Sequence, residues 1–173
     1  MVYYDIKSCF DCLYECFHPD DKCPISDEVE KVYRKIASYD VLFMSLPVYS
    51  GTPCSKYFAF RERSQSVFHD SELYERFENV SKYYIVIGNE EAGGKETVKL
   101  ISSDLTKHED IILLQSHKYD QNSISGSLIQ LKEVKEKLKA FAVKALQKHM
   151  DKKIIIFKQM FHEVFPDFVK KIP

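Results

Sequence analysis

An apolar run that ends in proline and glycine, VLFMSLPVYSG at residues 41–51, constrains the fold more than any other segment. A short run of this kind predicts a buried strand of a parallel sheet. Pro47 cannot donate to a sheet ladder and Gly51 tolerates unusual backbone angles, so we expect the chain to leave the sheet here as a shaped loop. Open α/β sheets bind ligands at the carboxyl ends of their strands. We therefore expect the functional site at this end of the strand.

The rest of the chain alternates between strand and helix patterns. Apolar runs predict further strands at residues 2–6, 82–88 and 110–116, and helical spacing predicts helices near residues 29–37, 57–67, 72–77, 98–105 and 128–150. Asp27 and Glu30 form a capping-box pattern before the first helix. Strands that alternate with helices predict an α/β fold with a mostly parallel sheet covered on both faces.

Length and charge narrow the classes of function. The 173 residues suit one main domain, with 25 basic residues nearly balanced by 26 acidic ones. Neither nucleic acid nor a membrane surface is an expected partner, because no stretch concentrates one sign of charge. There is no apolar run near 18 residues, and the segment MVYYDIKSCF is too polar for a signal peptide, so we expect a cytoplasmic protein.

We divide the chain into a domain at residues 1–150 and a C-terminal extension at residues 151–173. The run IIIF at residues 154–157 predicts either a strand that replaces a missing first strand of the sheet or part of a terminal amphipathic helix. In the second case, four phenylalanines would make a terminal or dimer contact: Phe157, Phe161, Phe165 and Phe168.

Three short segments carry a resemblance to a known family. The sequences PVYSGTP at residues 47–53, FRER at 60–63 and NEEAGG at 89–94 resemble the flavodoxin-like NAD(P)H-dependent FMN reductases and iron–sulfur flavoproteins. The resemblance covers residues 2–148 and implies a flavodoxin-like three-layer sandwich. It also implies FMN as cofactor, NAD(P)H as electron donor and a homodimer.

In this family the loop at residues 47–52 would lie against the isoalloxazine ring, and the loop at residues 88–94 would close over it. Backbone amides at helix starts donate to ring oxygens, and a tyrosine face stacks on the ring. No side chain is needed as an acid or base. The cofactor-binding candidates are Pro47, Val48, Tyr49, Ser50, Gly51, Thr52, Gly88, Asn89, Glu90, Gly93 and Gly94.

The chain departs from the family pattern at three points. Phe58 stands where a lysine is usual, and Glu62 replaces an aspartate before an arginine. No strand ending in a glycine, serine and threonine loop, which would hold the FMN phosphate, is found ahead of residue 2. Three interpretations remain: an FMN-dependent oxidoreductase, a non-catalytic interaction or redox-sensing module, and a subunit completed by a partner.

Four cysteines gather near the start of the chain: Cys9, Cys12, Cys16 and Cys23. Their compact spacing suits a single segment that wraps a metal ion or a cluster. The resemblance implies an iron–sulfur cluster here, although the family places its third cysteine one position earlier, where this chain has Glu15. Zinc, free or packed thiols and a redox dithiol of Cys9 and Cys12 are the alternatives.

Overall fold

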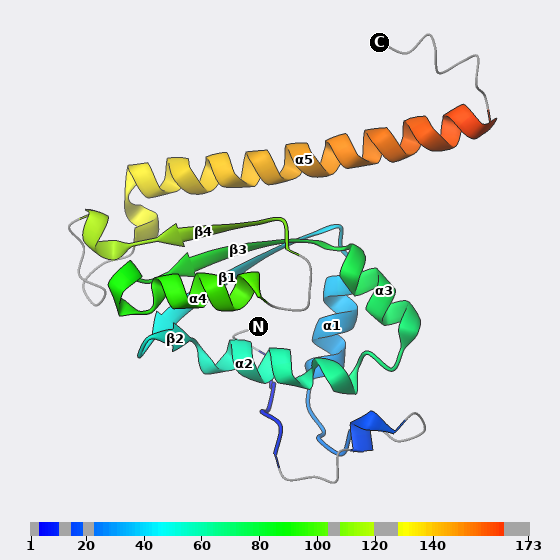
Figure 1. Ribbon diagram of the computed structural model, residues 1–173, viewed down its shortest axis with the longest axis horizontal. Coiled ribbons are helices and arrows are strands. Elements are labelled where there is room, and N and C mark those ends of the chain that lie inside the picture. Colours follow the sequence, from blue (N-terminus) through cyan, green and yellow to red (C-terminus); the bar gives the residue numbers. More distant parts are fainter. Residues whose placement is uncertain (1–3, 11–14, 19–22, 104–107, 120–127, 165–173) are drawn as a thin grey trace. The chain divides into compact units, whose positions relative to one another are not determined.

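A computed structural model describes residues 4–10, 15–18, 23–103, 108–119 and 128–164, with the backbone alone described beyond residue 151 (Figure 1). The chain divides into two compact units, residues 1–126 and residues 127–173. The division falls ahead of the long last helix, whereas the sequence-based division falls at residue 150.

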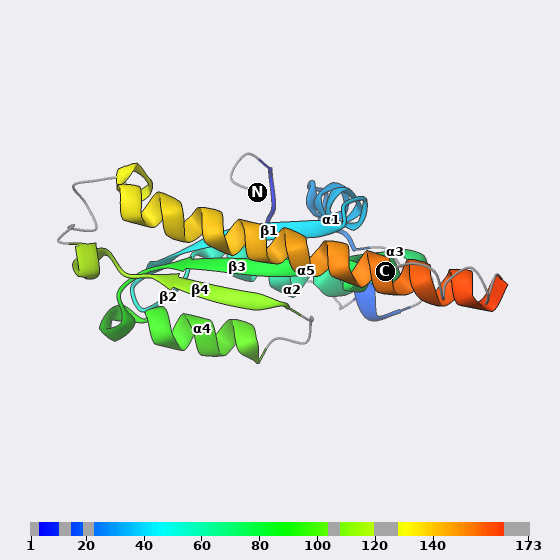
Figure 2. The ribbon, with the colours of Figure 1, turned by 90° about the horizontal axis from the view of Figure 1, so that it is seen from above.

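The first unit is built on a sheet of four strands in the order β2, β1, β3, β4 (Figure 2). The strands are β1 (Val41–Tyr49), β2 (Thr52–Pro53), β3 (Ser81–Ile87) and β4 (Asp110–Leu114). The pairs β1–β3 and β3–β4 are parallel, and the short β2 runs antiparallel to the end of β1. The expected α/β class with a mostly parallel sheet is confirmed, and it is consistent with a flavodoxin-like sandwich.

Four helices of this unit lie on one face of the sheet (Figure 1). They are α1 (Val29–Ala37), α2 (Ser55–Glu62), α3 (Ser71–Asn79) and α4 (Gly94–Ser102). Met44 and Leu46, two residues apart on β1, point into the core beneath these helices, as the alternation of a strand requires. Short 3₁₀ turns complete the unit: η1 (Glu15–Phe17), η2 (Arg63–Ser66), η3 (Glu90–Ala92) and η4 (Ser116–Tyr119).

Aromatic rings fill much of the core between the helices. The Tyr33 ring stacks on Phe60 with 4.3 Å between centroids, and it meets Phe68 edge-on. The Tyr33 hydroxyl donates to the carbonyl oxygen of Phe60 over 2.8 Å, so its polar end is satisfied inside the core. This cluster joins α1 to the C-terminal half of α2.

Two predictions near the start of the chain are wrong. Residues 4–10 form no strand, although Ile6 is buried in the core; residues 2 and 3 lie outside the described part. The capping box does not form, because Asp27 turns its carboxylate to a long-range partner as well as to the N–H of Val29, and Glu30 pairs with Arg34 instead.

The second unit consists of η5 (Leu128–Gln130) and α5 (Lys132–Val164). Helix α5 contains residues 154–157, so this β-branched run is helical where one of the two interpretations expected a strand. Intrinsic propensity is a weak term that a continuous helix overrides. Within the described ranges, no helix combines the length and apolar character needed to cross a membrane.

Candidate functional site

The loop at residues 47–52 begins as a tight hairpin turn. Tyr49 pairs with Thr52, and the two residues between them have positive φ angles, +49° at Ser50 and +82° at Gly51. Two consecutive positive φ angles are typical of the type I′ turn of a two-residue hairpin. The turn folds the chain back from the carboxyl end of β1 and leaves the Tyr49 side chain 64% exposed.

The two predicted cofactor loops pack directly against each other. A Cβ atom added to Gly93, whose φ is +95°, would overlap the backbone of Gly51. A Cβ atom added to Gly88 would lie 2.7 Å from the Cβ of Val48. The contact therefore requires glycine on the side of loop 88–94, and it brings together residues that lie some forty positions apart in the sequence.

The end of β4 joins the same edge of the sheet. The Asn89 side-chain oxygen accepts hydrogen bonds from the hydroxyl of Ser116 at 3.0 Å and from the backbone N–H of His117 at 3.3 Å. The Gln115 side-chain oxygen accepts from the N–H of Glu90 at 3.3 Å. The ends of β1, β3 and β4 thus supply one connected set of loops. The sequence patterns did not indicate that Gln115 and Ser116 take part in it.

Helix α4 starts directly behind loop 88–94. The N–H of Gly94 donates to Asn89 O at 2.9 Å, which closes the loop onto the helix. One turn further, the Thr97 hydroxyl is buried and, within the described part of the chain, has no hydrogen-bond partner. A buried hydroxyl without a partner costs free energy, so a ligand oxygen or an ordered water at this position would stabilise it.

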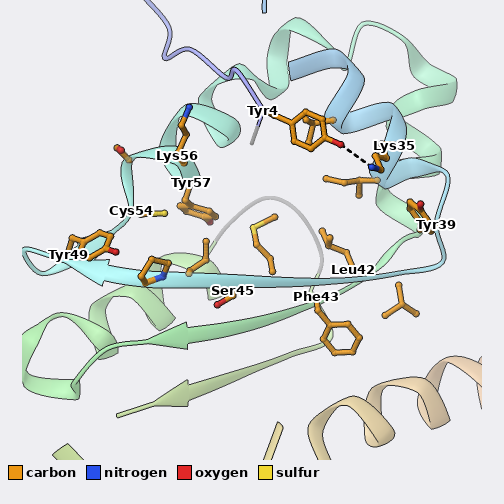
Figure 3. Close-up of a pocket in the computed structure, with 17 residues that line it drawn as sticks. Tyr4, Lys35, Tyr39, Leu42, Phe43, Ser45, Tyr49, Cys54, Lys56 and Tyr57 are labelled. Carbon is orange, nitrogen blue, oxygen red and sulfur yellow. Dashed lines mark hydrogen bonds between the residues drawn. The ribbon is translucent and has the colours of Figure 1, made fainter. Parts of the chain in front are cut away.

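A hollow of about 670 Å³ runs along the outer edge of β1, and we call it the β1 hollow (Figure 3). Its walls are β1 itself, α1 through Val32 and Ile36, α2 through Tyr57, and the ring of Tyr4 on the side opposite β1. Pro47 and Tyr49 line the end nearest the predicted cofactor loops, whereas loop 88–94 contributes nothing to its wall. Of the two loops, only the first therefore borders this hollow.

A second set of contacts organises the cysteine segment. The Arg63 guanidinium forms an ion pair with Asp27 at 2.6 Å, and both side chains are 1% exposed. Arg63 also donates to the carbonyl oxygens of Lys7 at 3.2 Å and Ile25 at 3.5 Å. Because Lys7 and Ile25 flank the four cysteines, Arg63 closes the base of the segment that carries them.

The charges around this base shift two pKa values. Burial of Asp27 opposes its ionisation, but N–H donors from Lys7 and Val29 and the guanidinium of Arg63 outweigh that effect and hold the pKa of Asp27 below its usual value. Loss of water around the sulfur, followed by the negative charge of Glu62, raises the pKa of the Cys9 thiol. Cys9 is therefore a poor nucleophile at neutral pH.

Glu62 holds Cys9 at the surface. Its carboxylate accepts from the N–H of Cys9 at 2.6 Å, and its carbonyl oxygen lies 3.8 Å from the Cys9 sulfur. Cys16 and Cys23 are close enough for their charges to raise the pKa of Cys9 further. Within the described residues no three His, Cys, Asp or Glu side chains are grouped to hold a metal ion. Cys12 lies outside these residues, so the four-cysteine site stays a prediction.

Part of this network could have been found in the sequence. Glu62 and Arg63 belong to the FRER segment that carries the family resemblance, but Asp27 was expected only as a helix cap. The partners are 36 residues apart, and no local pattern reports a pair at that separation.

No family model, curated protein or solved structure matches the chain.

Proposed function

We propose that the chain is an FMN-dependent oxidoreductase that binds the flavin ring at the carboxyl edge of its sheet. The observation that supports this most strongly is the contact between loops 47–52 and 88–94, with glycine where a side chain would separate them. Ligand sites of open α/β sheets lie at this edge. An exposed tyrosine, Tyr49, stands beside the contact and offers a face on which a planar ring can stack.

The residues present suit the ring better than the phosphate. Backbone N–H groups at the start of α4 would be the donors for ring oxygens. Within the described residues ahead of β1, no strand leads into a glycine- and hydroxyl-rich helix start that would cradle a phosphate. We therefore expect the ring to supply most of the binding free energy in this chain.

The bound flavin would accept a hydride from NAD(P)H and pass electrons to an acceptor. The chain's own task is to orient the ring. Tyr49 would fix its face, loop 88–94 would fix its edge, and the hydrogen bonds from Ser116 and His117 to Asn89 would keep that loop rigid. No carboxylate or imidazole is required as a proton carrier in this scheme.

The test is to purify the protein without oxygen after expression with flavin available, and to record its visible spectrum with its iron, sulfide and zinc content. We expect flavin absorption in a stoichiometric amount. In titrations of the flavin-free protein, riboflavin should bind within about tenfold of FMN, a difference of about 1.4 kcal/mol. A colourless protein that binds neither FMN nor riboflavin would refute the proposal.

A second candidate function is an interaction module without catalysis. The feature that favours it is the β1 hollow, an apolar space beside an open strand edge that loop 88–94 does not line. This candidate predicts a protein that stays colourless and binds another polypeptide.

A further inference from the structure

The outer edge of β1 carries backbone groups that its pairing with β2 does not reach. On the side opposite β3, β2 pairs only with Val48 and Tyr49, and no other described strand adjoins β1 there. Pro47 O accepts from the N–H of Cys54 on this outer side. Because backbone groups alternate along a strand, the N–H and C=O groups of Val41 and Ser45 point the same way as those of Pro47.

The open edge faces the β1 hollow and not a flat surface. The lining opposite β1 is largely apolar, with Val32 and Ile36 from α1 and Tyr57 from α2. The ring of Tyr4 lies across the hollow from β1 (Figure 3). Side chains of a strand placed along β1 would alternate, with every second one directed toward these apolar residues. An edge of about seven residues matches a strand of ordinary length.

The far wall is anchored independently of β1. Lys35 donates to the hydroxyl of Tyr4 at 3.0 Å, and Lys56 donates to the carbonyl oxygen of Ile6 at 3.2 Å. The backbone N–H of Glu28 donates to the carbonyl oxygen of Asp5 at 2.8 Å, and the Glu28 carboxylate accepts from the N–H of Asp5 at 2.9 Å. The hollow is therefore a slot with two built sides.

We propose that the β1 hollow binds an extended segment of another polypeptide, which adds to the sheet as a strand beside β1. The outer edge of β1 offers its backbone hydrogen-bonding groups to one added strand. A second copy of the chain could add to this edge only through its own β1. The helices and the Tyr4 ring beside that strand would contact the Tyr4 wall of the first copy before the two strands could pair. The mode of recognition is strand addition, in which backbone hydrogen bonds supply affinity and alternate side chains supply specificity.

Charge defines the chemistry of the segment further. The charged residues that line the hollow are Lys35 and Lys56, and none of the described lining residues carries a carboxylate. The segment that fits best has apolar residues at alternate positions and acidic residues at its ends. This inference does not rest on flavin binding, because it uses the edge and the hollow and not loop 88–94.

The experiment titrates the full chain with a capped seven-residue peptide in which three valines alternate with two threonines between terminal glutamates. Calorimetry measures binding, and hydrogen exchange measures the protection of backbone amides. We expect binding, with slowed exchange at Val41 and Ser45. The same peptide with every backbone nitrogen methylated should not bind, since it cannot donate to β1.

The matched variants are Ser45→Pro and Ser45→Ala. Proline removes the outward N–H, and the neighbouring Pro47 shows that this edge accommodates proline. Ser45→Pro should weaken peptide binding by about fivefold or more, equivalent to one hydrogen bond of about 1 kcal/mol, whereas Ser45→Ala should bind like the unchanged protein.

Four results would overturn the inference. They are absence of peptide binding, equal binding of the methylated peptide, protection of Val41 and Ser45 that appears with protein concentration alone, and full protection in the dilute protein without peptide. The third result would indicate a second copy at the edge, and the fourth a segment of the same chain. Flavin binding is measured separately, so failure of either proposal is distinguishable from failure of the other.

Discussion

At the scale of single residues, the buried pair of Asp27 and Arg63 links segments of the first unit that are far apart in the sequence. It joins the start of α1 to the end of α2 and closes the base of the cysteine segment. A buried pair of this kind adds little net stability over an apolar substitute, but loss of one partner leaves an uncompensated charge.

We predict that Asp27→Asn lowers the free energy of unfolding by about 3–5 kcal/mol, because the guanidinium of Arg63 loses its counter-charge inside the protein. Urea denaturation followed by circular dichroism measures the effect. Glu30→Gln is the control, since it breaks an exposed pair with Arg34 on the same helix and should change stability only slightly. Equal effects of both substitutions would contradict the role assigned to Asp27.

The same pair predicts a dependence of stability on pH. The pKa of Asp27 is lower in the folded state, so its stabilisation is complete above the unfolded value of about 3.9 and is lost as the pH falls through the folded pKa. Thermal midpoints recorded from neutral to strongly acidic pH should therefore fall more steeply for the unchanged protein than for Asp27→Asn. Parallel curves would show that Asp27 contributes nothing to acid unfolding.

We also predict that Glu62→Gln makes Cys9 more reactive. The substitution removes a negative charge that raises the pKa of the thiol, while the amide oxygen still accepts from the N–H of Cys9. Iodoacetamide should alkylate Cys9 faster at mildly alkaline pH, as followed by mass spectrometry, with Cys9→Ser identifying the modified site. An unchanged rate would mean that Glu62 does not raise this pKa.

At the scale of elements, the site depends on how closely two loops approach. Gly51 and Gly93 both have positive φ, but only Gly93 has backbone where a Cβ would lie, while the space around Gly51 is open. Substitutions at the two glycines can therefore be compared: both introduce backbone strain, but only a substitution at Gly93 also introduces a steric overlap.

We predict that Gly51→Ala costs about 1–2 kcal/mol of stability, the strain of a left-handed backbone, and leaves the loops in contact. Gly93→Ala adds the overlap with Gly51, so it should destabilise the protein more and weaken flavin binding beyond any effect of Gly51→Ala. Denaturation curves and flavin fluorescence titrations of both variants provide the comparison. Equal losses of stability and affinity would show that the contact between the loops is unimportant.

Sequence reasoning worked where a pattern is local and periodic. Strands β1, β3 and β4 begin or end within about two residues of their predicted limits, because short apolar runs that end in proline, glycine or serine leave few alternatives. The meeting of loops 47–52 and 88–94 also follows, since parallel strands place their carboxyl ends at one edge. The overlap of Gly93 with Gly51 could not be predicted, because it depends on atomic positions.

The sequence-based predictions failed where the contacts of a segment are with residues distant in the sequence, or where a single short apolar run was the whole basis of the prediction. The run at residues 2–6 reads as a strand, yet residues 4–10 are held by Glu28 and Lys56 without strand pairing. The run at residues 154–157 is β-branched and still helical within α5. In both cases tertiary contacts or helix continuity override the local preference.

At the scale of the whole molecule, the first unit combines two features that the proposals keep apart. A set of loops at the carboxyl edge of the sheet suits a planar cofactor, and an open strand edge beside the β1 hollow suits an added strand. The two proposals therefore use different parts of the sheet, its carboxyl edge and the outer edge of β1.

The most direct test of flavin binding at the carboxyl edge is an NMR titration of the backbone amides with FMN, with riboflavin as comparison. We predict that both flavins shift the amides of residues 48–52, 88–94 and 116–119, with little change in α3, on the opposite end of the sheet. Absence of shifts at saturating flavin, or shifts confined to residues outside these loops, would contradict the proposed site.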